Sequence, residues 1–301
     1  MEPAGAEPAA TGSGVAEVRG DARPDGDDAG TRVPHDALVA SLRPRSVPAV
    51  LDRGIDLLRI RPGRWFGLGA ALLLPVWLFD LILLVTVGAD TVERIPLGPS
   101  VLRLEESSWA LAVIALHAIA LSLLGIAVGT AARAWQDRSD PSTGELLRAA
   151  LARTWTAVVI VTLAGLAAAA ASCLFGVGYL LAAPLFFTAS IVAGAERTGP
   201  LVALRRSIAL ARAAYGRALG LASGSLALTQ VVRFSCWLGP VALAGLLGAG
   251  DGLLVPMERI GGLVVVVVEP LTAAFALSAY LDLRCRVEGL DLELRTRERF
   301  A

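Results

Sequence analysis

This chain lacks lysine and asparagine entirely and has little histidine. Its 301 residues include two histidines, His35 and His117, and all 27 basic residues are arginine. A hydrolase site that depends on histidine, or a metal site with several histidine ligands, is therefore excluded. The sequence also contains no Walker-type glycine loop and no HExxH, CxxC or nucleophile-elbow motif. We accordingly expect no catalytic site, no cofactor and no metal.

Cysteine and net charge are scarce as well. Cys173 and Cys236 fall in apolar stretches and Cys285 in a basic tail, which gives neither a disulfide framework nor a metal-ligand spacing. The formal net charge is zero, so the whole chain has no electrostatic basis for binding nucleic acid. Hydrophobic residues make up 55% and the mean hydropathy is +0.65, values typical of an integral membrane protein.

Residues 1–47 have a different composition from the rest. They are rich in Ala, Gly, Pro, Asp and Glu and contain almost no large apolar side chains. Such a segment cannot bury enough surface to fold, so we expect a disordered tail, with a regulatory or binding role as the alternative. It lacks the pattern of a signal peptide, and the first apolar span is expected to act as the signal anchor.

Apolar stretches long enough to cross about 30 Å of hydrocarbon follow this tail. The predicted spans are Phe66–Gly88, Trp109–Ala132, Val158–Leu174, Tyr179–Ala195, Ala218–Leu246 and Ile260–Leu281. The third and fourth share one block interrupted by Gly176, Gly178 and Pro184, which predicts a tight hairpin. The alternative is one span and a re-entrant piece, which would move the C-terminus to the other side. Trp65, Trp109 and Trp155 lie at span ends, as in an interfacial aromatic belt.

The distribution of arginine among the connections decides between the hairpin and the re-entrant topology. It is concentrated in residues 43–64, 133–153, 197–217 and 284–299, whereas the opposite connections hold only Arg94, Arg103 and Arg259. Basic connections stay on the cytoplasmic side. The sequence therefore predicts a bacterial plasma-membrane protein with six spans and both termini in the cytoplasm: a transmembrane domain over 48–282 and a cytoplasmic tail over 283–301.

Each odd-numbered span follows a short amphipathic basic stretch. In the first, Leu51, Ile55 and Leu58 share a helical face; in the second, Ser142 and Glu145 have the spacing of a capping box. We interpret the fold as three transmembrane hairpins, each preceded by an interfacial helix, with simple positive-inside decoration as the alternative. In the third stretch, Arg205, Arg206 and Arg212 are candidate contacts for anionic lipid.

Small residues at helix-packing spacing indicate a compact bundle. They are Gly125 and Gly129, Gly220 and Gly224, and the run from Ala164 to Ala171.

Four ionisable residues lie inside the apolar spans. An unpaired charge at the bilayer centre costs at least about 2.5–3.5 kcal/mol, so each needs a reason. They are Asp80, His117, Arg233 and Glu269. The fifth and sixth spans are joined by a short connection, so Arg233 and Glu269 can pair. Glu269 precedes Pro270, and a carboxylate beside the carbonyl freed by a proline resembles a proton or cation site. We favour the structural interpretations, an ion pair that fixes helix registration or an Arg233 that snorkels outward, with the proton or cation site as the alternative.

Three segments resemble a family of actinobacterial membrane proteins. They are Pro270-Leu271 with AYLDLRCRVEGLDLELR (Ala279–Arg295), ERTGPLVALRRSIALARAAYGRALG (Glu196–Gly220) and LDRGIDLLRIRPGRWFGLGA (Leu51–Ala70). The family is labelled the membrane domain of glycerophosphoryl diester phosphodiesterases. In some relatives this module precedes a catalytic domain, for which the 301 residues are expected to leave no room, so the resemblance implies the membrane module without the enzyme.

Two functions remain open from the sequence. The first is a non-catalytic membrane scaffold or accessory partner in envelope or lipid metabolism. It could dock a protein through the tail, where Leu283, Leu290 and Leu294 form an apolar set. The second is a transporter or lipid-handling permease that uses the four intramembrane polar residues. An integral-membrane enzyme ranks third.

Overall fold

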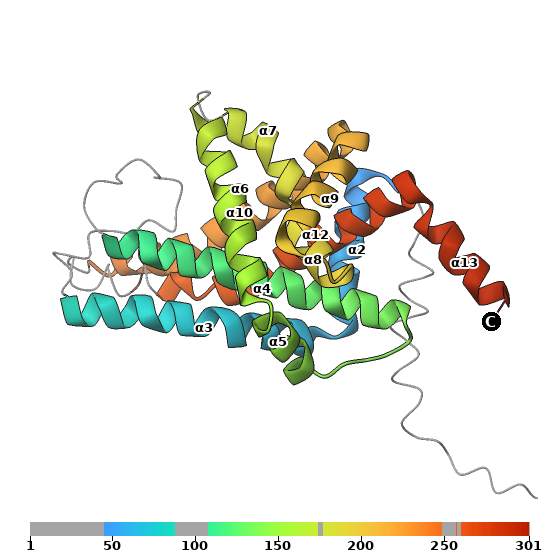
Figure 1. Cartoon of the computed structure of the whole chain (residues 1–301). Helices are drawn as coiled ribbons and strands as arrows, with labels where there is room; N and C mark the ends of the chain where they lie inside the picture. Colours follow the sequence, from blue (N-terminus) through green and yellow to red (C-terminus); the bar gives the residue numbers. More distant parts are fainter. Residues whose placement is uncertain (1–44, 88–107, 174–176, 249–256, 258–259, 301) are drawn as a thin grey trace, which may run out of the picture.

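The structure, a computed structural model, describes residues 45–87, 108–173, 177–248, 257 and 260–300 (Figure 1). Residues 1–44 of the predicted tail and the connections that hold Arg94, Arg103 and Arg259 lie outside these residues. The described chain is all-α, and six of its helices are long and apolar enough to cross a membrane. It is therefore an all-α, multi-pass integral membrane protein.

The helices follow one another as three units. The spans are α3 (Pro62–Val87), α4 (Ser108–Gln136), α6 (Thr154–Ser172), α7 (Val177–Phe186) with α8 (Ala189–Ala195), α10 (Tyr215–Leu246) and α12 (Val265–Glu288). The shorter helices are α2 (Val47–Ile60), α5 (Thr143–Leu151), α9 (Pro200–Ala213) and the C-terminal α13 (Leu290–Phe300). Because α2, α5 and α9 precede the three hairpins, the predicted alternation of short amphipathic helix and hairpin is confirmed.

The α5 helix starts at the predicted capping box. The Glu145 backbone N–H donates to Ser142 Oγ at 3.3 Å, and the Ser142 N–H donates to Glu145 Oε2 at 2.7 Å. Both N-terminal amides therefore have partners, which fixes the first turn of α5.

The α2 helix buries a different face from the predicted one. Its buried residues are Val50, Arg53, Gly54 and Leu57. The buried face is therefore rotated around the helix from the predicted one, and it includes an arginine. Gly54 lies against Phe275, where an added Cβ would be 3.2 Å from the ring Cε1 and 3.3 Å from the backbone Cα. Ser278 Oγ donates to the Val50 carbonyl at 2.6 Å. Thus α2 packs directly against α12.

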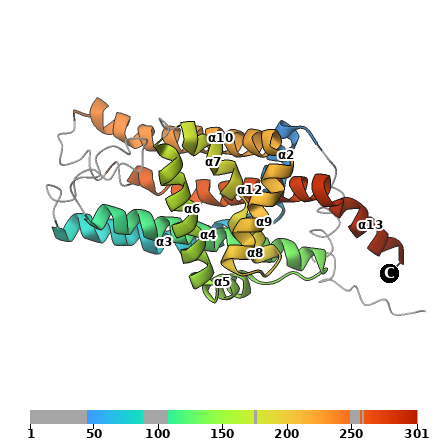
Figure 2. The ribbon, with the colours of Figure 1, turned by 45° about the horizontal axis from the view of Figure 1, so that its top comes forward.

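Four long helices, α3, α4, α10 and α12, lie side by side in both views (Figures 1 and 2). The central member is α12, which contacts α2, α3, α4, α8, α9, α10 and α13. In its most apolar window 61% of the residues are buried, against 6% in α10. The other elements are therefore positioned relative to α12, whereas α10 stands at the edge of the bundle.

The α6–α7 hairpin runs across these helices rather than alongside them (Figures 1 and 2). It returns to its start, because Arg153 Nη1, just before α6, donates to the Ala193 carbonyl in α8 at 2.6 Å. The predicted hairpin is therefore confirmed over the re-entrant alternative. The return leg breaks between α7 and α8, where Ser207 Oγ donates to the Leu185 carbonyl at 2.7 Å and lies 3.0 Å from Thr188 Oγ1.

Small residues serve close packing at two of the three predicted places. Gly129 in α4 and Gly194 in α8 face each other's backbone, where a Cβ would collide with the carbonyls of Ile191 and Ile126. In α10, Gly220 and Gly224 instead lie against side chains of α2. The run from Ala164 to Ala171 is exposed or half-buried, so the packing prediction for this run was wrong.

The α4–α8 contact provides the first test. Gly129→Ala and Gly194→Ala should each lower the free energy of unfolding by about 1–3 kcal/mol, because backbone carbonyls cannot move aside for the new methyl. Thermal unfolding in detergent measures this. Gly165→Ala in α6, with no neighbouring atom within 4 Å of the added Cβ, is the control and should not destabilise. Equal unfolding midpoints for Gly129→Ala and Gly165→Ala would contradict the packing.

Candidate functional site

Three of the four predicted intramembrane residues meet at one carboxylate. Glu269 in α12 is 3% exposed at its side chain, and its Oε1 accepts a hydrogen bond from Arg233 Nη2 of α10. His117 Nε2 of α4 lies 3.7 Å from the same oxygen. These three residues, the intramembrane triad, tie three spans together, and the predicted pairing of Arg233 with Glu269 is present.

The triad forms because α10 and α12 run antiparallel in one register. Arg217 Nε pairs with Asp282 Oδ2 at 2.6 Å near the other end of the two helices. From this pair to the Arg233–Glu269 pair, α10 advances about 24 Å and α12 about 20 Å at 1.5 Å per residue. Farther along, an added Cβ on Gly261 would lie 3.1 Å from Trp237 Cα. One helix alignment therefore satisfies both ion pairs and this close approach.

Pro270 lies directly beside the triad. It has no amide hydrogen, so the Val266 carbonyl loses its helical partner. The α3 helix approaches this point through Gly69, where an added Cβ would lie 2.5 Å from Pro270 Cγ and 3.0 Å from the Val266 oxygen. The absence of a side chain at Gly69 lets α3 close over the proline break.

Asp80 does not join the triad. It is 3% exposed in α3. Gly69 marks the level of Pro270, and Asp80 lies about 16 Å farther along α3 at 1.5 Å per residue. The predicted four-residue cluster is therefore a triad and one separate buried carboxylate.

A second buried carboxylate, Asp282, organises the arginine-rich end of the bundle. It is 0% exposed, and its Oδ2 accepts from Arg217 and from Arg286 Nε at 3.2 Å. Both arginines also donate to the backbone carbonyl of Arg45, which precedes α2. Arg53 of α2 is 1% exposed; burial lowers its pKa, an effect that the nearby Asp282 carboxylate opposes. Arg53 and Asp282 were not among the predicted site residues.

A second ion network ties α9 to α12. Arg206 Nε donates to Glu196 at 3.2 Å, and its Nη2 pairs with Glu288. Tyr280, 0% exposed, donates its hydroxyl to Glu196 Oε1 at 3.0 Å and accepts from Arg284 at 3.2 Å. Of the candidate lipid contacts, Arg206 is therefore engaged inside the protein.

The other two candidate lipid contacts, Arg205 and Arg212, are exposed on α9.

The C-terminal leucines are not a docking surface. Leu283, Leu290 and Leu294 are 2%, 2% and 5% exposed and belong to the protein core. The helix continues past the predicted boundary to Glu288 and ends at Gly289, whose φ of 68° is the left-handed conformation that glycine adopts readily. The prediction of a free docking face on these three residues was wrong; Leu292, 64% exposed, points away from the core.

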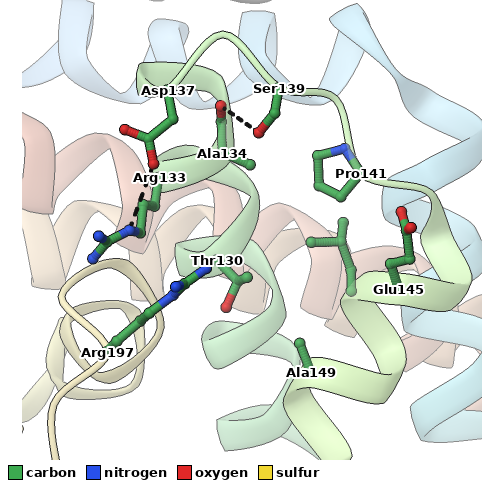
Figure 3. A pocket seen from close by; sticks show the side chains of 10 residues that line it. Thr130, Arg133, Ala134, Asp137, Ser139, Pro141, Glu145, Ala149 and Arg197 are labelled. Carbon is green, nitrogen blue, oxygen red and sulfur yellow. Dashed lines mark hydrogen bonds and ion pairs between the residues drawn. The ribbon is translucent and has the colours of Figure 1, made fainter.

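A pocket of about 210 Å³ opens beside the α4–α5 turn (Figure 3). Arg133 contributes Nη1 to the Ala195 carbonyl at 3.4 Å and Nε to Asp137 at 3.7 Å. Arg197, in the left-handed region with φ 52°, lines the same pocket. Burial and repulsion from Arg197 and Arg133 lower the pKa of the neighbouring Arg153. The arginines here balance the carbonyl ends of α4 and α8, where positive charge is stabilising.

Asp140, in the connection between α4 and α5, ties together the two helices of the first hairpin. It pairs with Arg61 Nη2 at 3.1 Å and with Arg64 Nη1, and it accepts from Trp135 Nε1 at 3.4 Å. The hydrogen bond from Arg64 holds the pKa of Asp140 below its usual value. The carboxylate thereby fixes the start of α3 against the end of α4.

No group of three or more His, Cys, Asp or Glu side chains placed to hold a metal occurs among the residues with described positions. No protein-family model, no curated protein and no solved structure matches this chain.

The triad predicts an asymmetric mutational response. Glu269→Ala should lower the free energy of unfolding by about 3–5 kcal/mol, because it leaves the Arg233 guanidinium in the spans without its carboxylate. Adding Arg233→Ala should recover part of this loss, since no unpaired charge remains. Thermal unfolding of the two single variants, the double variant and the wild type measures the coupling. Strictly additive losses would contradict the pairing.

The lowered pKa of Asp140 predicts that the stability of the folded protein depends on pH. A lowered pKa in the folded state stabilises the protein above the unfolded value of about 3.9, and the contribution disappears as pH falls through the folded value. Wild type should therefore have a higher unfolding midpoint than Asp140→Asn at pH 6–7, and the difference should shrink below about pH 4. Asp137→Asn, whose carboxylate is 59% exposed, is the control. A difference for Asp140→Asn that is as large at pH 3 as at pH 6–7 would contradict this account.

Proposed function

We propose that the protein is a non-catalytic component of the bacterial plasma membrane, a scaffold or accessory partner in envelope or lipid metabolism. The observation that carries this proposal is the internal use of its intramembrane charges. Glu269 is buried between Arg233 and His117, and the triad ties α4, α10 and α12. Because these charged side chains pair with one another and fix the helices, they support a rigid scaffold rather than a reaction.

The orientation of the protein in the membrane and the kind of partner are inferred from the sequence. The arginine-rich end, with α2, α9 and the start of α13, is the cytoplasmic face by the positive-inside rule. The exposed Arg205 and Arg212 on α9 then contact anionic lipid headgroups. The resemblance to phosphodiesterase membrane domains, modules that in some relatives precede a catalytic domain, points to a partner that acts on lipid or envelope substrates.

A transporter or lipid-handling permease is the second candidate. Its support is the position of the triad beside Pro270 and the 26% exposure of the Arg233 side chain in the middle of α10. A carboxylate beside a freed carbonyl is an arrangement that binds protons or cations. This candidate requires that Glu269→Gln abolish function while the protein stays folded.

Native mass spectrometry on protein extracted gently from its own membrane separates the two candidates. We expect a stoichiometric co-purifying protein that is retained by a folded Arg233→Ala/Glu269→Ala variant. The matched control is Asp56→Ala/Arg59→Ala, a surface pair whose side chains are 67% and 77% exposed. A bound lipid or small molecule that is lost only from the triad variant would contradict the scaffold and favour the permease.

A further inference from the structure

One polar side chain on the exposed face of α10 has no hydrogen-bond partner among the described residues. Gln230 is exposed and lies about 23 Å from each end of this 32-residue helix at 1.5 Å per residue. It makes no hydrogen bond within the described chain, whereas Arg233, one turn away, is held by Glu269. A primary amide at mid-span faces hydrocarbon, which offers neither donor nor acceptor.

Gln230 belongs to a regular strip along α10. The strip residues are spaced alternately by four and three positions and consist of Gly216, Gly220, Ser223, Ala227, Gln230 and Phe234. Gly220 is half-buried beside α2 and the other five are exposed. A period of 3.5 residues is the period with which one helix meets another along a left-handed crossing. The exposed small residues Gly216, Ser223 and Ala227 permit close backbone approach.

We propose that this strip is a dimerisation surface that takes α10 of a second copy of the chain. A two-fold axis along the membrane normal brings equal depths together, so each Gln230 faces the other. An amide carries both donor and acceptor, so two Gln230 side chains satisfy each other. None of the six strip residues is charged, so two copies meet without repulsion. This inference does not depend on the proposed function.

Single-cysteine crosslinking in native membranes tests the surface. In a background with Cys173, Cys236 and Cys285 replaced by serine, Ala227→Cys should form a disulfide-linked dimer under a mild oxidant. Leu228→Cys is the matched control, because it has the same depth and is 38% exposed but points about 100° away around the helix. Equal crosslinking of the two variants, or an adduct with the mass of another protein, would overturn the proposal.

The amide is tested separately in the otherwise native chain. Gln230→Leu replaces an exposed side chain that has no internal partner, so the fold should be unaffected. The dimerisation constant, measured by Förster transfer between labelled copies in liposomes, should fall about 3- to 30-fold, the range for polar contacts between membrane helices. An unchanged constant for Gln230→Leu would overturn the role of the amide.

Discussion

Two buried carboxylates on one helix constrain the rest of this structure. Glu269 and Asp282 of α12 are 2% and 0% exposed. A carboxylate in such surroundings is tolerated only when a cation pairs with it. Because both cations, Arg233 and Arg217, come from α10, the two helices can align in only one register. The ion pairs thereby act as positional constraints within an apolar interface that would otherwise permit sliding.

The other units are fixed to the same helix by local means. The first unit reaches α12 twice, through Gly54 of α2 against Phe275 and through Gly69 of α3 against Pro270. The third unit adds Arg206 of α9, paired with Glu288 at the end of α12. In contrast, α6 and α7 contact α4, α9 and α10 directly, and α8 adds a glycine contact with α4 that needs no charge. Charged pairs therefore fix α9 and α10 to α12, whereas close glycine contacts fix α2 and α3 to α12 and α8 to α4.

The sequence predicted the spans, the three-unit order and the clustering of arginine, because hydropathy and charge are properties of each segment alone. It indicated that Arg233 and Glu269 can pair, since the two spans are adjacent and antiparallel, but whether they pair was left open until the structure placed them together. Depth counted from Trp65 did not exclude Asp80, because Trp65 is buried against Trp135 and does not mark the membrane surface. Gly69, level with Pro270, places Asp80 farther along the span than the triad. The comparison thus separates segmental properties, which were predicted, from relative placement, which was not.

Two further errors share one cause. Trp65, predicted in an interfacial belt, is 0% exposed, meets Trp135 edge to face and donates its Nε1–H to the Leu57 carbonyl at 3.0 Å. The buried face of α2 includes Arg53 instead of the predicted set. Both residues lie where a basic segment folds back onto the bundle. Amphipathicity alone does not distinguish a helix packed on protein from one lying in headgroups, because each buries an apolar side.

The central claim, that the ion pairs fix the register of α10 on α12, is tested most directly by a disulfide between α10 and the segment just before α12. In a background free of other cysteines, Trp237→Cys/Gly261→Cys should crosslink efficiently, because these backbones approach closely. Replacing Arg233, Glu269, Arg217 and Asp282 by alanine should sharply reduce this crosslink in protein that remains inserted. An undiminished crosslink without either ion pair would contradict the account.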